Sequence, residues 1–594
     1  MVIKILEIVN DLKENYAKVR KLLDEDSKND PENEPYLSKY KAKDILNNMR
    51  DVLCNISEAE SGLTTIQVDA LKGAVLLCIG NVDMETEDLP ACEKALKEGE
   101  DILLPSALEP EVIILLVNVQ NNLGLLWSFR DEPEKAKYYL LSSKKKCEDF
   151  KATLRMPVPI ESILSITTLS EDSVVTDFLV LEKAHTLTLY YLAQVYGSLK
   201  ENLKSAIYCH VTLRRQLMYK DYEAIEWSLN CATLSQVFVE QNGFYQSRYH
   251  LAAASTILDQ YETELLASES DSEVYLAKKE TFKHRSADVA RCWVKYCICL
   301  MSASKDRLMS DADNVVDAIT GKNYEETCMP ESDIKQLVFP ELDVSKYEEK
   351  IGDKFLLTYE DAREVFICCQ GWLNKAKDYY RADTLASDHI ELVQDCSQAY
   401  AYLAFFEEDD ERRAKMYKRR VDMLEDLLKE INPTYYLQYC RQLWYELGEV
   451  YSEILNIKLE KLNMSKEKPT PHLLKKINML CEKSIENYDK FLDSVKDKTG
   501  LLPAKLQTDE IRPVISAYVY IGRNSMKRIA VGKNIYLNHI KKSYDSYYAV
   551  VDICKKDPEA AKMMKEEYAL CQEMVSILPL KIKKVESELQ ALKL

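Results

Sequence analysis

The chain has 594 residues, a formal net charge of −19, and only 14 Gly and 17 Pro. An acidic chain of this kind is not expected to bind nucleic acid or an anionic membrane surface, since both ligands require a basic face. The shortage of Gly and Pro disfavours a β-rich fold with many tight turns and favours long helices. The negative charge suits a basic protein partner, with simple solubility as the alternative explanation.

The 17 Cys fall mostly inside helical patterns, where a thiol is expected to act as a small buried apolar group. Their odd number, and an amphipathic helix that begins directly after Met1, predict a reducing compartment and no signal peptide. No uninterrupted apolar run reaches 18 residues, so no transmembrane helix is expected.

Hydrophobic periodicity predicts helices through the first half of the chain. They are expected at 2–26 and 38–56, as a hairpin within 65–104, as a second hairpin within 111–150, and as two more hairpins within 183–258, followed by a helix at 282–303. A loop with short helical pieces is predicted between 155 and 180, where Pro157 and Pro159 precede a run of Ser and Thr.

Periodicity fades between 306 and 347, where Pro and acidic residues dominate. We therefore predict an N-terminal helical subdomain at 1–305, an acidic and partly disordered linker at 306–350, and a C-terminal helical subdomain at 351–594. Helices in the last of these are expected at 358–381, 386–406, 410–430, 434–462, 472–494, 510–530, 535–555 and 558–592, the last interrupted at Pro579.

Residues 183–258 contain two helical hairpins with the same internal offsets. Each has a large residue, a small residue and an aromatic residue on its first helix, and small, large or polar residues at matching offsets on its second helix. These residues are Leu192, Ala193 and Tyr196 with Ser205, Cys209 and Thr212, and then Leu234, Ser235 and Phe238 with Ser247, Leu251 and Ala254. The spacing is that of a tetratricopeptide (TPR) hairpin, in which the small residue lets the second helix approach closely.

Comparable positions recur at intervals that are too long for a regular array. Leu123 and Leu192 are 69 residues apart, and Leu192 and Leu234 are 42 apart, whereas a regular TPR array steps by about 34. The predicted fold is therefore all-α, an irregular TPR-like α-solenoid (a right-handed superhelix of antiparallel helix pairs) in two halves.

The sequence shows no catalytic or metal-binding pattern. It lacks a Walker sequence, HExxH, GxSxG and CxxC, and its seven His do not pair with Cys, Ser or carboxylates at a diagnostic spacing. We predict no catalytic residues, no metal and no cofactor, and hence a protein that is not an enzyme.

A TPR groove contacts its ligand through outward positions on the first helix of each pair. The predicted partner-binding residues are Asn121, Tyr190, Gln194, Gln236, Tyr445, Glu449 and Ser452, with Leu125, Gly197 and Val239 beside them. They include amides, tyrosines and an acid but no Lys or Arg, which disfavours the cationic clamp of TPR co-chaperones and favours a basic or amphipathic helix as ligand. For each residue, packing between repeats is the alternative.

Several strings outside the general TPR pattern resemble one family, the KIF-binding (kinesin-binding) proteins. They are Glu34-Pro35-Tyr36 with Ser38-Lys39-Tyr40, Gln120-Asn121-Asn122-Leu123-Gly124, Tyr190-Tyr191-Leu192-Ala193-Gln194-Val195-Tyr196, Ile225-Glu226-Trp227, Ala290-Arg291-Cys292-Trp293, His389-Ile390-Glu391, Ala404-Phe405-Phe406-Glu407 with Glu411-Arg412-Arg413, Lys475-Lys476-Ile477-Asn478 and Met574-Val575-Ser576. The resemblance extends from the N-terminus to the C-terminus.

The resemblance implies a cytoskeletal adaptor that binds kinesin motor domains and keeps them off microtubules, and so regulates organelle transport and axonal development. It also implies a cytoplasmic or cytoskeletal location, and we expect a monomer. A net charge of −19 suits competition for the basic face with which a kinesin meets acidic tubulin. The alternative from the sequence is a generic TPR peptide-binding scaffold or co-chaperone.

Overall fold

The computed structural model describes residues 2–55, 63–159, 162, 171–313, 337–464, 469–498, 500–503 and 505–591, and every regular element in these ranges is a helix. The contacts divide the chain into two compact units. Unit 1 holds the helices up to Leu266 and the segment 337–346; unit 2 begins at Ala267 and resumes at Tyr347. The all-α prediction is confirmed.

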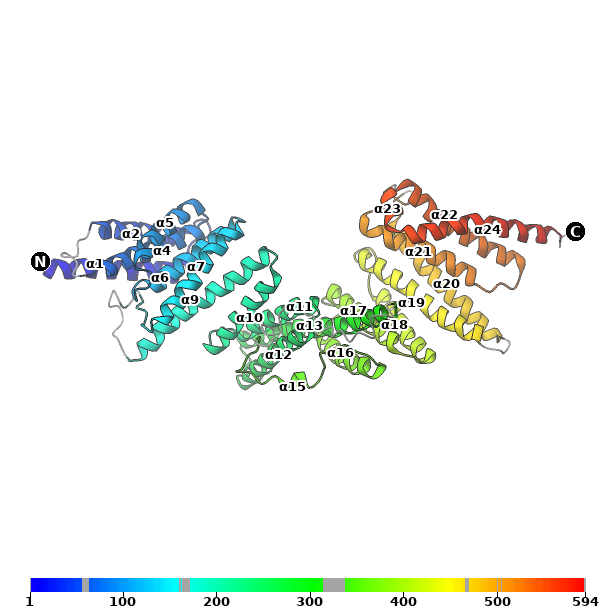
Figure 1. Cartoon of the computed structure of the whole chain (residues 1–594), viewed down its shortest axis with the longest axis horizontal. Helices are drawn as coiled ribbons and strands as arrows, with labels where there is room; N and C mark the ends of the chain where they lie inside the picture. Colours follow the sequence, from blue (N-terminus) through cyan, green and yellow to red (C-terminus); the bar gives the residue numbers. More distant parts are fainter. Residues whose placement is uncertain are drawn as a thin grey trace. The chain divides into compact units, whose positions relative to one another are not determined.

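Unit 1 is a succession of helices in which each packs beside its neighbours in the sequence (Figure 1). The helices are α1 (Val2–Asp24), α2 (Leu37–Cys54), α4 (Thr65–Glu85), α5 (Leu89–Leu103), α6 (Ile113–Phe129), α7 (Pro133–Ala152), α9 (Glu171–Ser198), α10 (Asn202–Met218), α11 (Ala224–Glu240) and α12 (Phe244–Ala267), with short 3₁₀ turns at Asp26–Asn29 and Leu104–Ser106. The predicted hairpins at 65–104, 111–150 and 183–258 all form.

The turns between paired helices of unit 1 share one geometry although they lack a glycine at the critical position. Glu87, Asp131, Lys200, Lys220 and Asn242 each have a positive φ, between 51° and 63°. At each turn this residue and the next donate their backbone N–H groups back into the preceding helix, as in Asp131 to Ser128 and Glu132 to Trp127. This is the Schellman arrangement, which usually employs Gly, so the shortage of Gly does not prevent short turns.

The segment 337–346, which we call the returning segment, packs onto α10, α11 and α12. Phe339 is fully buried, with its ring 4.6 Å from that of His210 and 5.2 Å from that of Trp227. The Phe339 backbone N–H donates to the Tyr249 hydroxyl at 2.8 Å, and this hydroxyl donates to the Phe339 carbonyl oxygen at 3.3 Å. The returning segment is thus part of the core of unit 1.

Unit 2 repeats the pairing of neighbouring helices with longer elements (Figure 1). They are α13 (Glu273–Asp313), α16 (Tyr359–Tyr379), α17 (Ala386–Phe406), α18 (Asp410–Glu430), α19 (Leu437–Met464), α20 (Pro471–Val495), α21 (Thr508–Lys527), α22 (Lys533–Lys556), α23 (Pro558–Met563) and α24 (Lys565–Ala591). The short helix α15 (Ser345–Glu348) begins in the last residues assigned to unit 1 and ends in unit 2. Their bounds lie within a few residues of most of the predicted ones, although α13 extends well beyond both ends of 282–303.

Two glycines of unit 2 mark close helix contacts. A Cβ on Gly448 would lie 2.8 Å from the Tyr488 ring, and one on Gly522 would lie 2.7 Å from the Tyr547 ring. In each pair a serine of the second helix donates to the glycine carbonyl oxygen. Ser484 donates to Gly448 at 2.7 Å, and Ser543 donates to Gly522 at 2.9 Å. The predicted role of the small residue is confirmed at these two positions.

One expectation about the last helices is wrong. Pro579 lies inside α24, and the break comes instead at Met564, between α23 and α24. A proline removes one backbone donor, which a long packed helix tolerates, whereas the Asp557 carboxylate starts α23 by accepting from the Glu559 and Ala560 N–H groups.

By length and composition, α4 is apolar enough to cross a membrane. However, 56% of its apolar window is buried within the fold, as in a core helix.

The predicted subdomain bounds (1–305, 306–350 and 351–594) stay a prediction. The middle part of the predicted linker lies outside the described residues.

Candidate functional site

Tyr190 and Gln194 lie on the surface of α9, as predicted. The Tyr190 side chain is 43% exposed and its ring lies 5.7 Å from that of Tyr191. Gln194 and Gly197 are also exposed, while Leu192 on the same helix is fully buried. One face of α9 therefore presents an aromatic ring and an amide to solvent, which suits contact with a protein partner.

Gln236 on α11 is half-buried, and its Nε2 donates to Ser235 Oγ at 2.9 Å. Leu125 is also half-buried, whereas Val239 is buried at 5% exposure. The expectation of an outward position is therefore wrong for Val239, which packs in the core.

The outward position predicted for Asn121 is also wrong, because the side chain is fully buried between α6, α7 and α9. Asn121 Nδ2 donates to the Ala184 carbonyl oxygen at 3.1 Å, and its Oδ1 accepts from Thr188 Oγ1 at 2.8 Å and from Ser143 Oγ at 3.2 Å. A buried amide requires such partners, so Asn121 joins three helices instead of facing a groove.

Ser452 repeats this outcome in unit 2, and its predicted outward position is wrong. It is 2% exposed, and its Oγ accepts from Asn524 Nδ2 at 2.6 Å and lies 2.9 Å from Ser484 Oγ. The three residues come from α19, α20 and α21. Each unit thus contains a buried Asn with two hydroxyl side chains at the junction of three consecutive helices.

Tyr445 and Glu449 lie one turn apart on α19, and both are half-buried. The Tyr445 ring makes edge contacts with Tyr488 at 5.6 Å and with Phe491 at 5.4 Å between ring centroids. Burial raises the pKa of the Tyr445 hydroxyl well above its usual range. Tyr445 is therefore a neutral hydrogen-bonding group with its ring held by packing.

Burial raises the pKa of Glu449 to about 7, and nearby Glu446 and Glu453 raise it further against the opposing effect of Arg420. Near neutral pH the neutral and the charged form of this carboxyl group are therefore both populated. A cation placed beside it would favour the charged form. The α19 surface is thus suited to a Lys or Arg from a partner.

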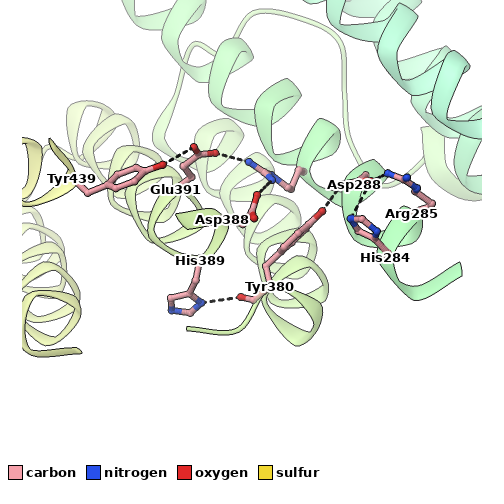
Figure 2. A network of polar contacts seen from close by, with 9 residues as sticks. His284, Arg285, Asp288, Tyr380, Asp388, His389, Glu391 and Tyr439 are labelled. Carbon is pink, nitrogen blue, oxygen red and sulfur yellow. Dashed lines mark hydrogen bonds and ion pairs between the residues drawn. The ribbon is translucent and has the colours of Figure 1, made fainter. Parts of the chain in front are cut away.

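Figure 2 shows a polar network in unit 2 that joins α13, α16, α17 and α19. The Arg291 guanidinium donates to Asp388 Oδ1 and to Glu391 Oε2, each at 2.6 Å, and the Tyr439 hydroxyl donates to Glu391 Oε1 at 3.3 Å. The Tyr380 hydroxyl donates to Asp288. Every donor and acceptor in these four bonds belongs to a side chain of this protein, so the network holds the helices together.

This network was not predicted as a site, although its two halves were visible in the sequence. Arg291 lies in one of the strings that carry the family resemblance, and His389 and Glu391 lie in another. His389 Nδ1 donates to the Tyr380 carbonyl oxygen at 2.9 Å, since a carbonyl can only accept. Arg291 and Glu391 are 100 residues apart in the sequence, and their ion pair shows that the two strings meet in space.

Within the described parts of the chain, no group of three or more His, Cys, Asp or Glu side chains is arranged to hold a metal ion. Of the sixteen described cysteines only Cys54 is exposed. Burial raises the pKa of several of the others, for example Cys147 to about 12, which keeps the thiol protonated and weakly reactive.

Comparison with known proteins identifies the group to which the chain is related. Residues 225–585 match the family model described as KIF-1 binding protein C terminal. The chain is 36% identical to the KIF-binding protein of Drosophila melanogaster, over 98% of each chain, and 34% identical to that of Homo sapiens, over 94% of this chain and 95% of the relative.

Solved structures agree with the sequence matches. The structure titled "Kinesin binding protein (KBP)" superposes with a TM-score of 0.63 at 29% identity, covering 96% of this chain and 98% of the other. A second, titled "Cryo-EM map of KIFBP", gives a TM-score of 0.60 at 28% identity, covering 94% and 96%. With similarity of sequence and of fold over nearly the whole length, the chain belongs to the KIF-binding protein family.

Proposed function

We propose that this protein is an adaptor that binds kinesin motor domains. The observation that carries the proposal is family membership over nearly the full length, since relatives at 34–36% identity are named for binding KIF proteins. The whole fold is shared with them, so a function that depends on the arrangement of helices can be shared too.

Binding is proposed to occur at the basic face with which the motor contacts microtubules, and so to block microtubule attachment. A chain with a net charge of −19 attracts such a face over distances of about 10 Å at 0.1 M salt. The consequence in the cell would be regulation of organelle transport and axonal development, exerted by a monomer in the cytoplasm or at the cytoskeleton.

Two surfaces are proposed to make the contact, one in each unit. In unit 1 it is formed by Tyr190 and Gln194 on α9, with Gln236 on α11; in unit 2 it is formed by Tyr445 and Glu449 on α19. The exposed ring of Tyr190 and the shifted pKa of Glu449 support their inclusion. Aromatic side chains are common anchors at protein interfaces.

The test combines a pull-down with a microtubule co-pelleting assay, each using a purified kinesin motor domain. We expect the protein to capture the motor and to reduce the fraction that pellets with microtubules. The double variant Tyr190→Ala/Gln194→Ala should weaken capture by about tenfold, the loss of roughly 1.4 kcal/mol from an interface anchor.

Tyr138→Ala is the matched control, because Tyr138 is a 69% exposed tyrosine on α7 outside the proposed surfaces. Its capture of the motor should equal that of the unmodified protein. If the motor is captured in the pull-down but pellets with microtubules equally with and without the protein, kinesin binding is supported and the block of microtubule attachment is ruled out.

A further inference from the structure

A cavity of about 560 Å³ opens in unit 1 among α7, α9 and α10. Its walls include Lys144 of α7, His185 of α9, and Lys204, Tyr208 and Arg215 of α10. At 100° per residue, Tyr190 and Gln194 lie roughly 140° and 180° around α9 from His185. The cavity is therefore on a different face of α9 from the proposed kinesin-binding residues.

His185 lies in this wall, and Lys151 holds its ring in place. The side chain is 5% exposed, and its Nδ1 lies 2.9 Å from Lys151 Nζ. An ammonium group can only donate, so Nδ1 accepts and the ring proton lies on Nε2. Nε2 is buried and has no hydrogen-bond partner among the described residues. Because Nε2 has almost no accessible surface, His185 helps to shape the wall, and its N–H does not reach into the cavity.

Positive charge gathers around the same cavity. Arg215 and Lys151 both pair with the buried carboxylate of Glu182, and Lys151 Nζ lies 2.6 Å from Glu182 Oε2. Two cations and one anion leave these three residues with one excess positive charge. Burial and the two neighbouring cations lower the pKa of His185 to about 3, so the ring adds no charge to the cavity.

Lys144 and Lys204 line the cavity as well, and each has a partly exposed acidic neighbour, one of which, Glu148, is also a lining residue. Lys144 lies 3.6 Å from Glu148, and Lys204 lies 2.5 Å from Glu201. Exposed pairs of this kind are weak and exchange readily with another anion.

Two stacked tyrosines position these lysines. The rings of Tyr196 and Tyr208 are 5.4 Å apart and nearly parallel. Lys204 Nζ lies 5.3 Å from the centroid of the Tyr196 ring, and Lys144 Nζ lies 5.6 Å from that of Tyr208. Contacts between a cation and a ring face favour positions of both ammonium groups beside the cavity.

We propose that this cavity binds a carboxylate side chain of an acidic peptide segment. The carboxylate would pair with Lys144 and Lys204, while the aliphatic part of its side chain would lie against the tyrosine rings. The face proposed for the kinesin motor is basic overall, whereas this cavity is proposed to take an acidic segment. The site is therefore assigned to a second partner of opposite charge and does not depend on the proposed function.

The test uses the full-length protein and a fluorescein-labelled hexaglutamate peptide, with hexaglutamine as the neutral probe, followed by fluorescence anisotropy. Hexaglutamate should bind saturably and hexaglutamine should not. The double variant Lys144→Gln/Lys204→Gln should weaken hexaglutamate binding by about tenfold or more, since two charge-assisted bonds are lost. Val211→Trp, which fills the cavity from its α10 wall, should abolish it.

Two further variants separate a specific site from general attraction. Lys145→Gln removes the same charge from an exposed neighbour on α7 that does not line the cavity, and it should leave the affinity within about twofold. Glu148→Gln removes a competing anion and should strengthen binding by about twofold. Equal losses for Lys145→Gln and Lys144→Gln/Lys204→Gln, or unchanged binding by Val211→Trp, would overturn the proposal. Kinesin capture should be unaffected by all of these variants.

Discussion

At the level of single residues, polar side chains in the helix pairs divide into two groups that look alike in the sequence. Asn121 and Ser452 are buried and bonded to neighbouring helices. Tyr190 and Gln194 occupy similar helix positions but face solvent. The difference lies in what packs against them, since a third helix covers the first pair and does not cover the second.

Glu449 should make the stability of the protein depend on pH. Its pKa is raised from 4.5 to about 7, so the folded state holds its proton more tightly than the unfolded state. The stability associated with the neutral form is complete below pH 4.5 and is lost as pH rises through 7. The loss amounts to at most about 3 kcal/mol.

Glu449→Gln keeps the neutral form at every pH. We therefore expect its thermal midpoint to match that of the unmodified protein near pH 4.5 and to exceed it at pH 8, as measured by differential scanning fluorimetry. Glu460→Gln, which changes an exposed glutamate on the same helix, is the control and should show no such trend. A constant difference between Glu449→Gln and the unmodified protein across this range would contradict the raised pKa.

At the level of helices and turns, the two units join their helices differently. In unit 1 the paired helices α6 and α7, α9 and α10, and α11 and α12 are separated by three-residue turns with one residue in the left-handed region. In unit 2, Gly500 is the only described residue with a positive φ. Helices of unit 2 instead end in extended residues such as Glu407 and Ile431. The connections that follow vary in length, from three residues between α17 and α18 to six between α18 and α19.

The returning segment should stabilise the helices on which it packs. Phe339 is fully buried against His210, Trp227, Tyr249 and His250. Phe339→Ala would leave a cavity there and should lower the local free energy of unfolding by about 3 kcal/mol. Hydrogen exchange followed by mass spectrometry should show faster exchange in peptides from α11 and α12.

Peptides from α19 to α22, in unit 2, provide the internal reference and should exchange as before. Phe129→Ala, at a 61% exposed position on α6, is the matched variant and should leave the α11 and α12 peptides unchanged. Unaltered exchange in Phe339→Ala would mean that the returning segment contributes little to the stability of unit 1.

For the molecule as a whole, net charge is the property that bears on the proposed partner. The value of −19 belongs to the chain and not to any one surface. It attracts a basic motor domain at a distance, and salt screens this attraction.

The affinity for a kinesin motor domain should therefore fall by at least about tenfold between roughly 50 and 300 mM salt, as measured by biolayer interferometry. Most of the change should appear in the association rate. Sucrose at matched viscosity serves as the control for non-ionic effects. An affinity independent of salt would show that apolar contacts, and not charge, govern the interaction.

Much of the fold could be predicted because helix periodicity is local. The bounds of α17 and α18 coincide with those expected, since each helix carries its apolar stripe within its own sequence. The predicted helix break at Pro579 is wrong, because the Asp557 cap starts a separate short helix, α23, and the proline lies inside α24. The candidate site was predicted less well: Tyr190 and Gln194 are exposed as expected, whereas Asn121 and Ser452 are not.

The all-α class, the helix pairs and the family can all be read from the amino-acid order, because propensity, apolar spacing and specific strings are properties of neighbouring residues. Helix packing, in contrast, sets which polar residues are covered, how the strings around Arg291 and Glu391 meet, and that Lys144, His185 and Lys204 surround one cavity. These outcomes depend on contacts between residues tens of positions apart, and such contacts exist only once the helices have packed.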